Sequence, residues 1–251
     1  MKQYDFTTKD KRTGEIKKCG YMRYDAAESN ANLYFYGDIC GESWMSKWYD
    51  EDKAPQDVVD FLAELENKTQ PIDIYINSGG GDVFGGLAIY NILKRYQGQK
   101  TAHIDGIAAS IAGIIPFACD KVIAPKSAQI MLHKPWSYCM GNADDMRKCI
   151  ESLDACEQSI INVYAENAVN GTTVDKIKDL IDTETWLTCG EAAQYFRIEL
   201  EDTEPVAACM SDYYAKYAKT PKSLTAPPKS ESKEQLNRKK KLQLELDCLS
   251  M

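Results

Sequence analysis

The chain has 251 residues, 44% of them hydrophobic and 27% charged, a composition that fits a globular protein and argues against both wholesale disorder and a membrane-embedded chain. Its formal net charge of −8 argues against general nucleic-acid binding by the body of the protein. Nine scattered cysteines and only two histidines do not form the clusters that a zinc site needs, so the sequence predicts reduced thiols, no metal and no cofactor.

The N-terminal part of the chain leads into the first predicted elements of a core. The first residues lack the apolar stretch of a signal peptide, which predicts a cytoplasmic protein. Residues 1–28 are polar and charge-rich and are interpreted as an arm. Strands are predicted at residues 33–36 and 72–76, separated by a helix with Pro55 in its first turn. The triglycine at residues 79–81 then ends the second strand and precedes another amphipathic helix.

The middle of the chain alternates short strands with helices. Strands are predicted at residues 101–105, 121–124 and 129–132, with a short apolar helix at residues 110–118 after the first of them. A long amphipathic helix opens at Asn142. This alternation predicts an α/β fold with a parallel-type sheet and flanking helices.

The composition changes near the C-terminus, and this change sets the predicted domain boundaries. The globular domain is assigned to residues 29–208, after the arm at residues 1–28. Between Lys216 and Lys241 there are nine Lys or Arg residues against two Glu. Such a segment has too little apolar surface to order itself, so residues 209–251 are predicted to form a basic, disordered tail.

Ser110 is the first residue that points to chemistry. It is flanked by small residues and lies between a predicted strand and the apolar helix. A hydroxyl at a helix N-terminus lies in the positive field of the helix dipole, and small neighbours let a substrate backbone approach. The same position suits an ordinary N-cap serine. Ser110 is therefore a candidate nucleophile that needs a partner to support it.

A serine hydroxyl is a poor nucleophile unless a base removes its proton, and imidazole titrates in the right range for this work. Of the two histidines, His103 lies within a short predicted strand, where a packed or surface role is expected. His133 follows the strand at residues 129–132 and projects into a loop. Because sites in parallel sheets form beyond the strand ends, His133 is the candidate general base.

A catalytic triad also needs a carboxylate that orients the imidazole, and an oxyanion hole of backbone N–H groups. Asp182 and Glu184 lie close together, and an extended segment would point both to the same side, so the residues alone leave the choice open. The turn at residues 79–81 supplies an adaptable backbone for the oxyanion hole. A phosphate-binding loop is the weaker interpretation because the Lys and the Ser or Thr of a P-loop are missing.

Four segments, taken in order, resemble the ClpP-type serine peptidase family. They are Tyr75-Ile76-Asn77-Ser78-x-Gly80-Gly81, Ala108-Ala109-Ser110, Met131-Leu132-His133-x-Pro135, and Trp186-Leu187-Thr188 with Glu191-Ala192. The resemblance covers about residues 33–201. It implies a ClpP/crotonase-like fold with a long handle helix, and a serine endopeptidase that acts on protein or peptide substrates.

The resemblance also assigns the site. It implies Ser110 as nucleophile, His133 as base, and the backbone N–H groups of Gly81 and Ile111 as oxyanion donors. Counting back from the Trp186 segment without a gap places the acid on Glu184, where the family carries Asp; Asp182 is the alternative. Gly79 replaces the family's usual proline, which loosens the turn without removing a donor.

Within this family, the segments around Asp82 and Trp136 and residues 141–145 look most like the phage-encoded, ClpP-related branch that matures viral proheads. That likeness implies scaffold, portal or capsid proteins as substrates, in the host cytoplasm or the prohead interior, and heptameric or tetradecameric rings of identical subunits. Two alternatives remain: a ClpP-type peptidase that works with an ATP-dependent unfoldase, and a crotonase-like acyl-CoA enzyme, which shares the fold and the oxyanion hole.

Overall fold

The computed structural model describes residues 2–9, 16–24, 30–41, 54–65, 67–203 and 211–225. The chain divides into two compact units, Met1–Lys219 and Thr220–Met251. The second unit is represented by one short helix, α6 (Lys222–Thr225). The rest of the basic tail predicted from the sequence lies outside the described residues.

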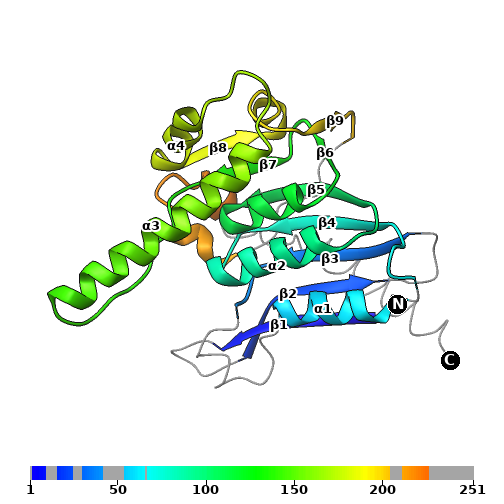
Figure 1. Ribbon diagram of the computed structural model, residues 1–251, viewed down its shortest axis with the longest axis horizontal. Coiled ribbons are helices and arrows are strands. Elements are labelled where there is room, and N and C mark those ends of the chain that lie inside the picture. Colours follow the sequence, from blue (N-terminus) through cyan, green and yellow to red (C-terminus); the bar gives the residue numbers. More distant parts are fainter. Residues whose placement is uncertain are drawn as a thin grey trace, which may run out of the picture. The chain divides into compact units, whose positions relative to one another are not determined.

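One sheet, built from nine strands among the described residues, forms the centre of the first unit (Figure 1). Its core strands run parallel; in spatial order they are β3 (Ala31–Gly37), β4 (Ile72–Ser78), β5 (Lys100–Ala109), β6 (Lys121–Pro125) and β9 (Glu199–Glu201). The end of β5 also pairs in parallel with β7 (Gln129–Leu132), which pairs in antiparallel fashion with β8 (Thr185–Thr188). The predicted α/β fold with a parallel sheet is confirmed.

The N-terminal segment adds two strands to the edge of this sheet. β1 (Lys2–Lys9) and β2 (Ile16–Tyr24) form an antiparallel pair, and β2 joins β3 through the pair Tyr21 and Tyr36. The sequence predicts only an arm at residues 1–28. Strand preference depends strongly on the neighbouring strands, so a polar composition gives little warning that a segment will extend a sheet edge.

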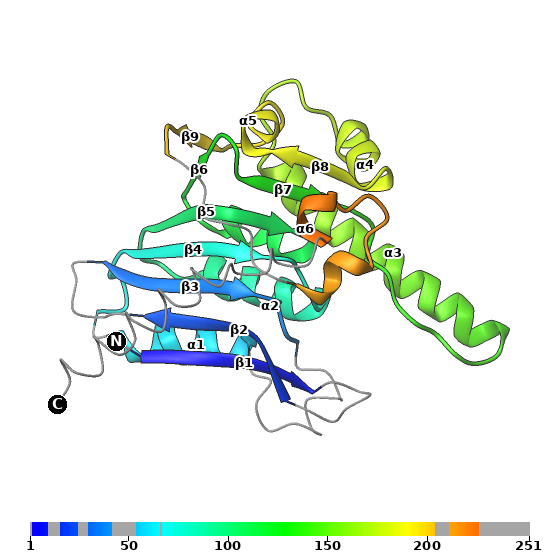
Figure 2. The ribbon, with the colours of Figure 1, turned by 180° about the vertical axis from the view of Figure 1, so that it is seen from behind.

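Helices flank the sheet, as predicted. α1 (Ala54–Glu64) and α2 (Val83–Arg95) lie on one face of it, and the reverse view shows the strands in front of them (Figures 1 and 2). The apolar segment after β5 is a 3-10 helix, η2 (Ser110–Ala118), and is buried from Ile111 onward. Two further helices, α4 (Val174–Asp182) and α5 (Cys189–Ala192), lie beside β8 (Figure 2).

The long helix predicted to open at Asn142 is α3 (Ala143–Glu166), whose first half projects beyond the sheet (Figures 1 and 2). Asn142 caps it: its side chain accepts from the backbone N–H groups of Asp144 and Asp145, and the Asp145 carboxylate accepts from the backbone N–H of Asn142. Among the described residues, no helix is both long and apolar enough to cross a membrane.

The first unit extends further toward the C-terminus than the sequence predicts. The predicted globular domain ends at residue 208, whereas the unit ends at Lys219 and includes a short 3-10 helix, η3 (Asp212–Ala215). The reason is that Tyr214 and Tyr217 are buried, although the segment around them is polar and basic. Two aromatic side chains bury enough apolar area to hold such a short segment against the body.

Candidate active site

Ser110 stands at a sharp turn where β5 ends and η2 begins. Its φ of 55° lies in the left-handed region, which is uncommon for residues other than glycine. Backbone strain of this kind often accompanies a functional side chain. The helix cap is Ala109 rather than Ser110, and the Ser110 hydroxyl bonds to a histidine instead. The ordinary N-cap interpretation therefore does not describe this serine.

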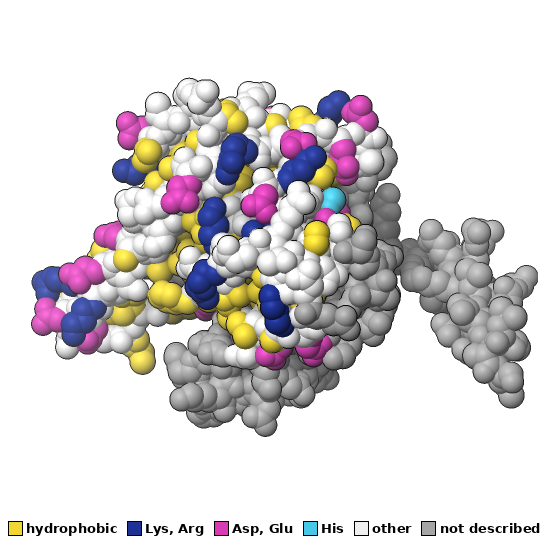
Figure 3. Space-filling view, turned by 45° about the vertical axis from the view of Figure 1, so that its right-hand side comes forward, with side chains coloured by type: hydrophobic (Ala, Val, Ile, Leu, Met, Phe, Trp, Pro, Cys, Tyr) yellow, Lys and Arg dark blue, Asp and Glu magenta, His cyan; other side chains and the backbone are white. Residues whose placement is uncertain are grey.

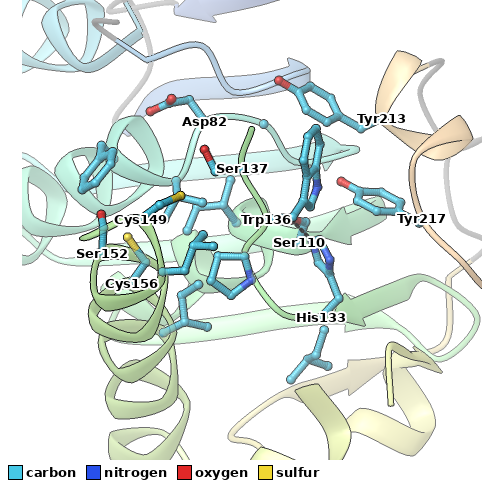
Figure 4. Close-up of a pocket in the computed structure, with 18 of the residues that line it drawn as sticks. Asp82, Ser110, His133, Trp136, Ser137, Cys149, Ser152, Cys156, Tyr213 and Tyr217 are labelled. Carbon is cyan, nitrogen blue, oxygen red and sulfur yellow. Dashed lines mark hydrogen bonds between the residues drawn. The ribbon is translucent and has the colours of Figure 1, made fainter. Parts of the chain in front are cut away.

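His133 lies one residue beyond β7 and faces Ser110 (Figure 4). The distance between Ser110 Oγ and His133 Nε2 is 2.6 Å, a short hydrogen bond. Burial disfavours the imidazolium and lowers the pKa of His133 to about 4, although the charge of Glu184 acts in the opposite direction. The imidazole is thus neutral at pH 7, and the tautomer with its proton on Nδ1 can accept the serine proton at Nε2.

The segment that carries the two candidate carboxylates is not extended, so the expectation of an extended segment is wrong. Asp182 ends α4, and its carboxylate pairs with the Lys134 ammonium at 2.9 Å. Glu184 has a φ of 47°, so the chain turns between them instead of running extended. The Glu184 carboxylate accepts hydrogen bonds from the indole of Trp186 at 3.3 Å, from the backbone N–H of Ala218 at 2.7 Å and from that of Lys219.

These hydrogen bonds set the charge of Glu184. Burial acts to raise the pKa of its carboxyl group, but the N–H donors of Lys219, Ala218 and Trp186 and the nearby His133 together bring the pKa below its ordinary value. Glu184 is therefore ionised at neutral pH. Among the described residues no hydrogen bond joins it to His133, so it acts on the imidazole through its charge.

The triglycine turn lies beside the serine. Gly80 and Gly81 have φ values of 103° and 149°, which other residues rarely adopt. A Cβ at Gly81 would lie 1.9 Å from the carbonyl oxygen of Ile39, so this position also needs glycine for space. No acceptor in the described part of the chain bonds to the N–H of Gly81. Ile111 follows Ser110 in the first turn of η2, where backbone N–H groups lack partners inside the helix.

A cavity of about 240 Å³ opens beside Ser110 and His133 (Figure 4). It is smaller than the roughly 300 Å³ at which pockets for whole small molecules begin, so it suits a single side chain. Its lining is largely apolar and comes from α2, η2, α3, the loop after β7 and the C-terminal segment. It includes Phe84, Ile111, Trp136, Leu153, Ile160 and Tyr213. Among the described residues, no group of three or more His, Cys, Asp or Glu side chains is arranged to hold a metal ion.

The C-terminal segment of the first unit contributes residues that the sequence prediction missed. The Tyr217 ring packs edge-on against the His133 ring at a centroid distance of 4.8 Å. Its hydroxyl donates to the carbonyl oxygen of Gly79 at 2.6 Å. The signal was present in the sequence, because three tyrosines at positions 213, 214 and 217 stand out in an otherwise polar segment. Buried tyrosines usually have a hydrogen-bond partner, and this one has it in the triglycine turn.

The chain is similar to known proteins of one family. The family model described as Clp protease matches residues 45–198. Over 130 residues the chain is 30% identical to an ATP-dependent Clp protease proteolytic subunit of Bacteroides fragilis, covering 51% of this chain and 62% of that subunit. Over 150 residues it is 31% identical to proteolytic subunit 1 of the ATP-dependent Clp protease of Chlamydia abortus, covering 57% of this chain and 77% of that subunit.

A third relative is proteolytic subunit 1 of the ATP-dependent Clp protease of Streptomyces avermitilis, 29% identical over 154 residues, which cover 59% of this chain and 70% of that subunit. The matched region spans less than two thirds of the Bacteroides subunit. The family model nevertheless matches more than half of the 251 residues and includes Ser110, His133 and Glu184. The chain belongs to the Clp protease family.

Proposed function

We propose that this protein is a serine endopeptidase that hydrolyses peptide bonds in protein substrates, with Ser110 as nucleophile and His133 as general base. The observation that carries the proposal is the 2.6 Å contact between Ser110 Oγ and His133 Nε2, made by a neutral imidazole. Nucleophile and base within hydrogen-bond reach, beside the turn that carries the Gly81 N–H, are the parts that acyl transfer requires.

The proposed reaction has two steps. In the first, His133 Nε2 takes the proton of Ser110 as Oγ attacks the peptide carbonyl carbon, and the resulting oxyanion is held by the N–H groups of Gly81 and Ile111. The imidazolium then gives its proton to the leaving amine, and an acyl-enzyme remains. In the second step, water attacks the ester carbonyl, His133 takes its proton, and Ser110 regains a proton as the acid product leaves.

Glu184 is the proposed third member of the triad. It is ionised, and its charge acts to stabilise a positive charge on His133. Asp182 is the alternative acid, but its carboxylate is engaged by Lys134 and is half exposed. A carboxylate contributes to a triad by stabilising the imidazolium and fixing the tautomer, and Glu184 is the better placed of the two for the first of these effects.

Replacement of the nucleophile tests the proposal directly. Ser110→Ala should lower kcat on a fluorogenic peptide by about 10⁴-fold or more, since in the described part of the chain no other hydroxyl is paired with the base. It should also abolish covalent labelling by a fluorophosphonate. Ser159→Ala is the matched control, because its hydroxyl donates to a carbonyl oxygen within α3. Undiminished labelling of Ser110→Ala, or no labelling of the wild-type protein, would contradict the assignment and favour chemistry without an activated serine.

The choice of acid is tested by two isosteric variants. Glu184→Gln removes the charge that favours the imidazolium and should lower kcat at least about tenfold. Asp182→Asn breaks an exposed ion pair with Lys134 and should change kcat by less than about twofold. If the two effects were reversed in a comparison of purified variants with unchanged circular dichroism, the acid would be Asp182.

The pH dependence follows from the pKa of His133. Because burial lowers this pKa from 6.5 to about 4, the free-base imidazole persists as the pH falls from 8 through 6.5. The acid limb of kcat/KM should therefore have its midpoint near pH 4. Folding stability should also decline between pH 6.5 and 4, since the unfolded chain takes up the histidine proton first. A kinetic midpoint near pH 6.5 would show that His133 is not buried as described.

We further propose, from the likeness of several segments to the phage-encoded branch, that the substrates are scaffold, portal or capsid proteins of a prohead. The names of the three relatives favour a second candidate, an ATP-dependent peptidase whose substrates are delivered by an unfoldase. Co-expression with neighbouring capsid genes distinguishes them. Shortened capsid or scaffold products that disappear in Ser110→Ala support the first, and degradation of a folded protein only with an ATPase supports the second.

A ring of identical subunits is the proposed assembly for either role. Large apolar side chains are exposed near the projecting part of α3, with Tyr138 89% and Met140 97% exposed and Ile150 also exposed. Exposed apolar side chains that gather in one region are typical of interaction surfaces. Charged side chains of both signs, among them the Asp144 and Arg147 ion pair, lie at the same projecting end (Figure 3). Opposite charges of this kind can fix the register between neighbouring copies.

A further inference from the structure

A segment of nine residues at the end of the first unit, residues 211–219, lies against the catalytic residues on the side of Tyr217 (Figure 4). We call it the strap. We propose that the surface beneath the strap is a peptide-binding site, that the strap is its built-in ligand, and that catalysis requires the strap to leave. This inference rests on the proposed peptidase function and adds a ligand class and a means of control to the same site.

The strongest contact of the strap is the Tyr217 side chain. Only 7% of this residue is exposed, and its ring packs against His133 and Trp186 at centroid distances of 4.8 and 6.1 Å. Its hydroxyl donates to the carbonyl oxygen of Gly79, at the start of the proposed oxyanion turn. One aromatic side chain thus covers the base and touches the turn, both of which a substrate must reach.

The backbone after Tyr217 forms hydrogen bonds with Glu184, the proposed acid of the triad. The N–H groups of Ala218 and Lys219 both donate to the Glu184 carboxylate, and Trp186 supplies a third donor. In a working triad a carboxylate accepts from the Nδ1 proton of the histidine. With its oxygens engaged by the strap, Glu184 has no hydrogen bond to His133 among the described residues. The bound strap therefore keeps the third member of the triad from its catalytic partner.

The other end of the strap is held by a hydrogen bond from Ser211, beside a glycine that leaves room for it. The Ser211 hydroxyl donates to the Asp38 carboxylate at 2.5 Å. Gly79 leaves the space that this contact needs, since a Cβ there would lie 2.4 Å from the Cβ and Oγ of Ser211. Between the two ends, the Lys216 ammonium lies 5.1 Å from the centre of the Trp136 ring.

These contacts resemble those of a bound peptide more than those of a core element. The backbone hydrogen bonds of Tyr214 and Lys216 close turns within the strap itself. The strap is attached to the body through side chains and through two N–H groups on one carboxylate. A segment held by a few polar and aromatic contacts can open without unfolding the sheet. The ligand expected at this surface is therefore a peptide with an aromatic residue followed by two residues other than proline, whose backbone N–H groups can donate to Glu184.

The first test is kinetic and uses the full chain. Tyr217→Ala removes the ring that covers His133 and should raise kcat/KM on a short fluorogenic peptide about tenfold or more, as expected if the open form is a minor population. The acid limb should move upward from near pH 4, because His133 becomes more exposed and gains Glu184 as an acceptor. Gly79→Ala should act in the same direction, because its Cβ collides with Ser211.

The matched control is Tyr96→Phe. The Tyr96 hydroxyl donates to the carbonyl oxygen of Gln70 at 2.7 Å, the same kind of bond that Tyr217 makes, but it lies just beyond α2 and away from the strand ends that carry the site. This variant should leave kcat/KM and the acid limb unchanged. Lower activity of both Tyr217→Ala and Gly79→Ala, with the fold intact by circular dichroism, would overturn the proposal and make the strap a structural wall of the site.

The second test separates the strap from the proposed function. A fluorescein-labelled peptide with the sequence of residues 211–219 should bind Tyr217→Ala, whose own site is open, and inhibit it competitively, with KM raised and kcat unchanged. Peptides with Ala at position 217 or Pro at position 218 should bind at least about tenfold more weakly, since they lack the ring or an N–H donor. If no variant shows peptidase activity, binding by fluorescence anisotropy still decides. Specific binding supports the peptide site, and absence of binding overturns it.

Discussion

The site depends on the register of three parallel strands. β5 and β7 pair so that Ala109 lies opposite Met131, which places Ser110 and His133 just beyond neighbouring strand ends. β4 pairs with β5 through Ser78 and Ala108, which brings the triglycine turn to the same edge. Because side chains alternate along a strand, a shift of the pairing by one residue would turn the side chains of that strand to the opposite face of the sheet. Fully buried side chains on one face of β4 and β5, such as Ile74, Ile76 and Ile104, hold that register.

The electrostatic environment separates the two titratable groups of the site. Burial keeps His133 neutral and able to accept a proton, while backbone and indole N–H groups keep Glu184 ionised. Environments that push two pKa values in defined directions are typical of acid–base sites. The donors to Glu184 come largely from the strap, however, so its charge is stabilised by the segment that also separates it from His133. The same hydrogen bonds from the strap to Glu184 therefore hold the strap in place and keep the proposed triad in its resting state.

Sequence patterns predict well what depends on local signals or on scarce residues. The strands, the Asn142 cap and the contact of Ser110 with His133 rather than His103 follow from periodicity, capping chemistry and a chain with two histidines. The patterns do not reveal contacts between distant positions. Ser211 and Asp38 are 173 residues apart, and Ala218 and Glu184 are 34 apart. The turn between Asp182 and Glu184 depends on a left-handed backbone at Glu184, where the sequence has no glycine to indicate it. The edge strands β1 and β2 depend on pairing with β3, which a polar composition does not signal.

The proposal of a neutral imidazole that accepts at Nε2 can be measured without any substrate. With two histidines in the chain, ¹⁵N NMR of the imidazole nitrogens can be assigned by a His103→Asn variant. We expect the His133 signals to report the Nδ1–H tautomer and a pKa of about 4. An Nε2–H tautomer, or a pKa near the ordinary value of 6.5, would contradict the assignment of His133 as the buried base of Ser110.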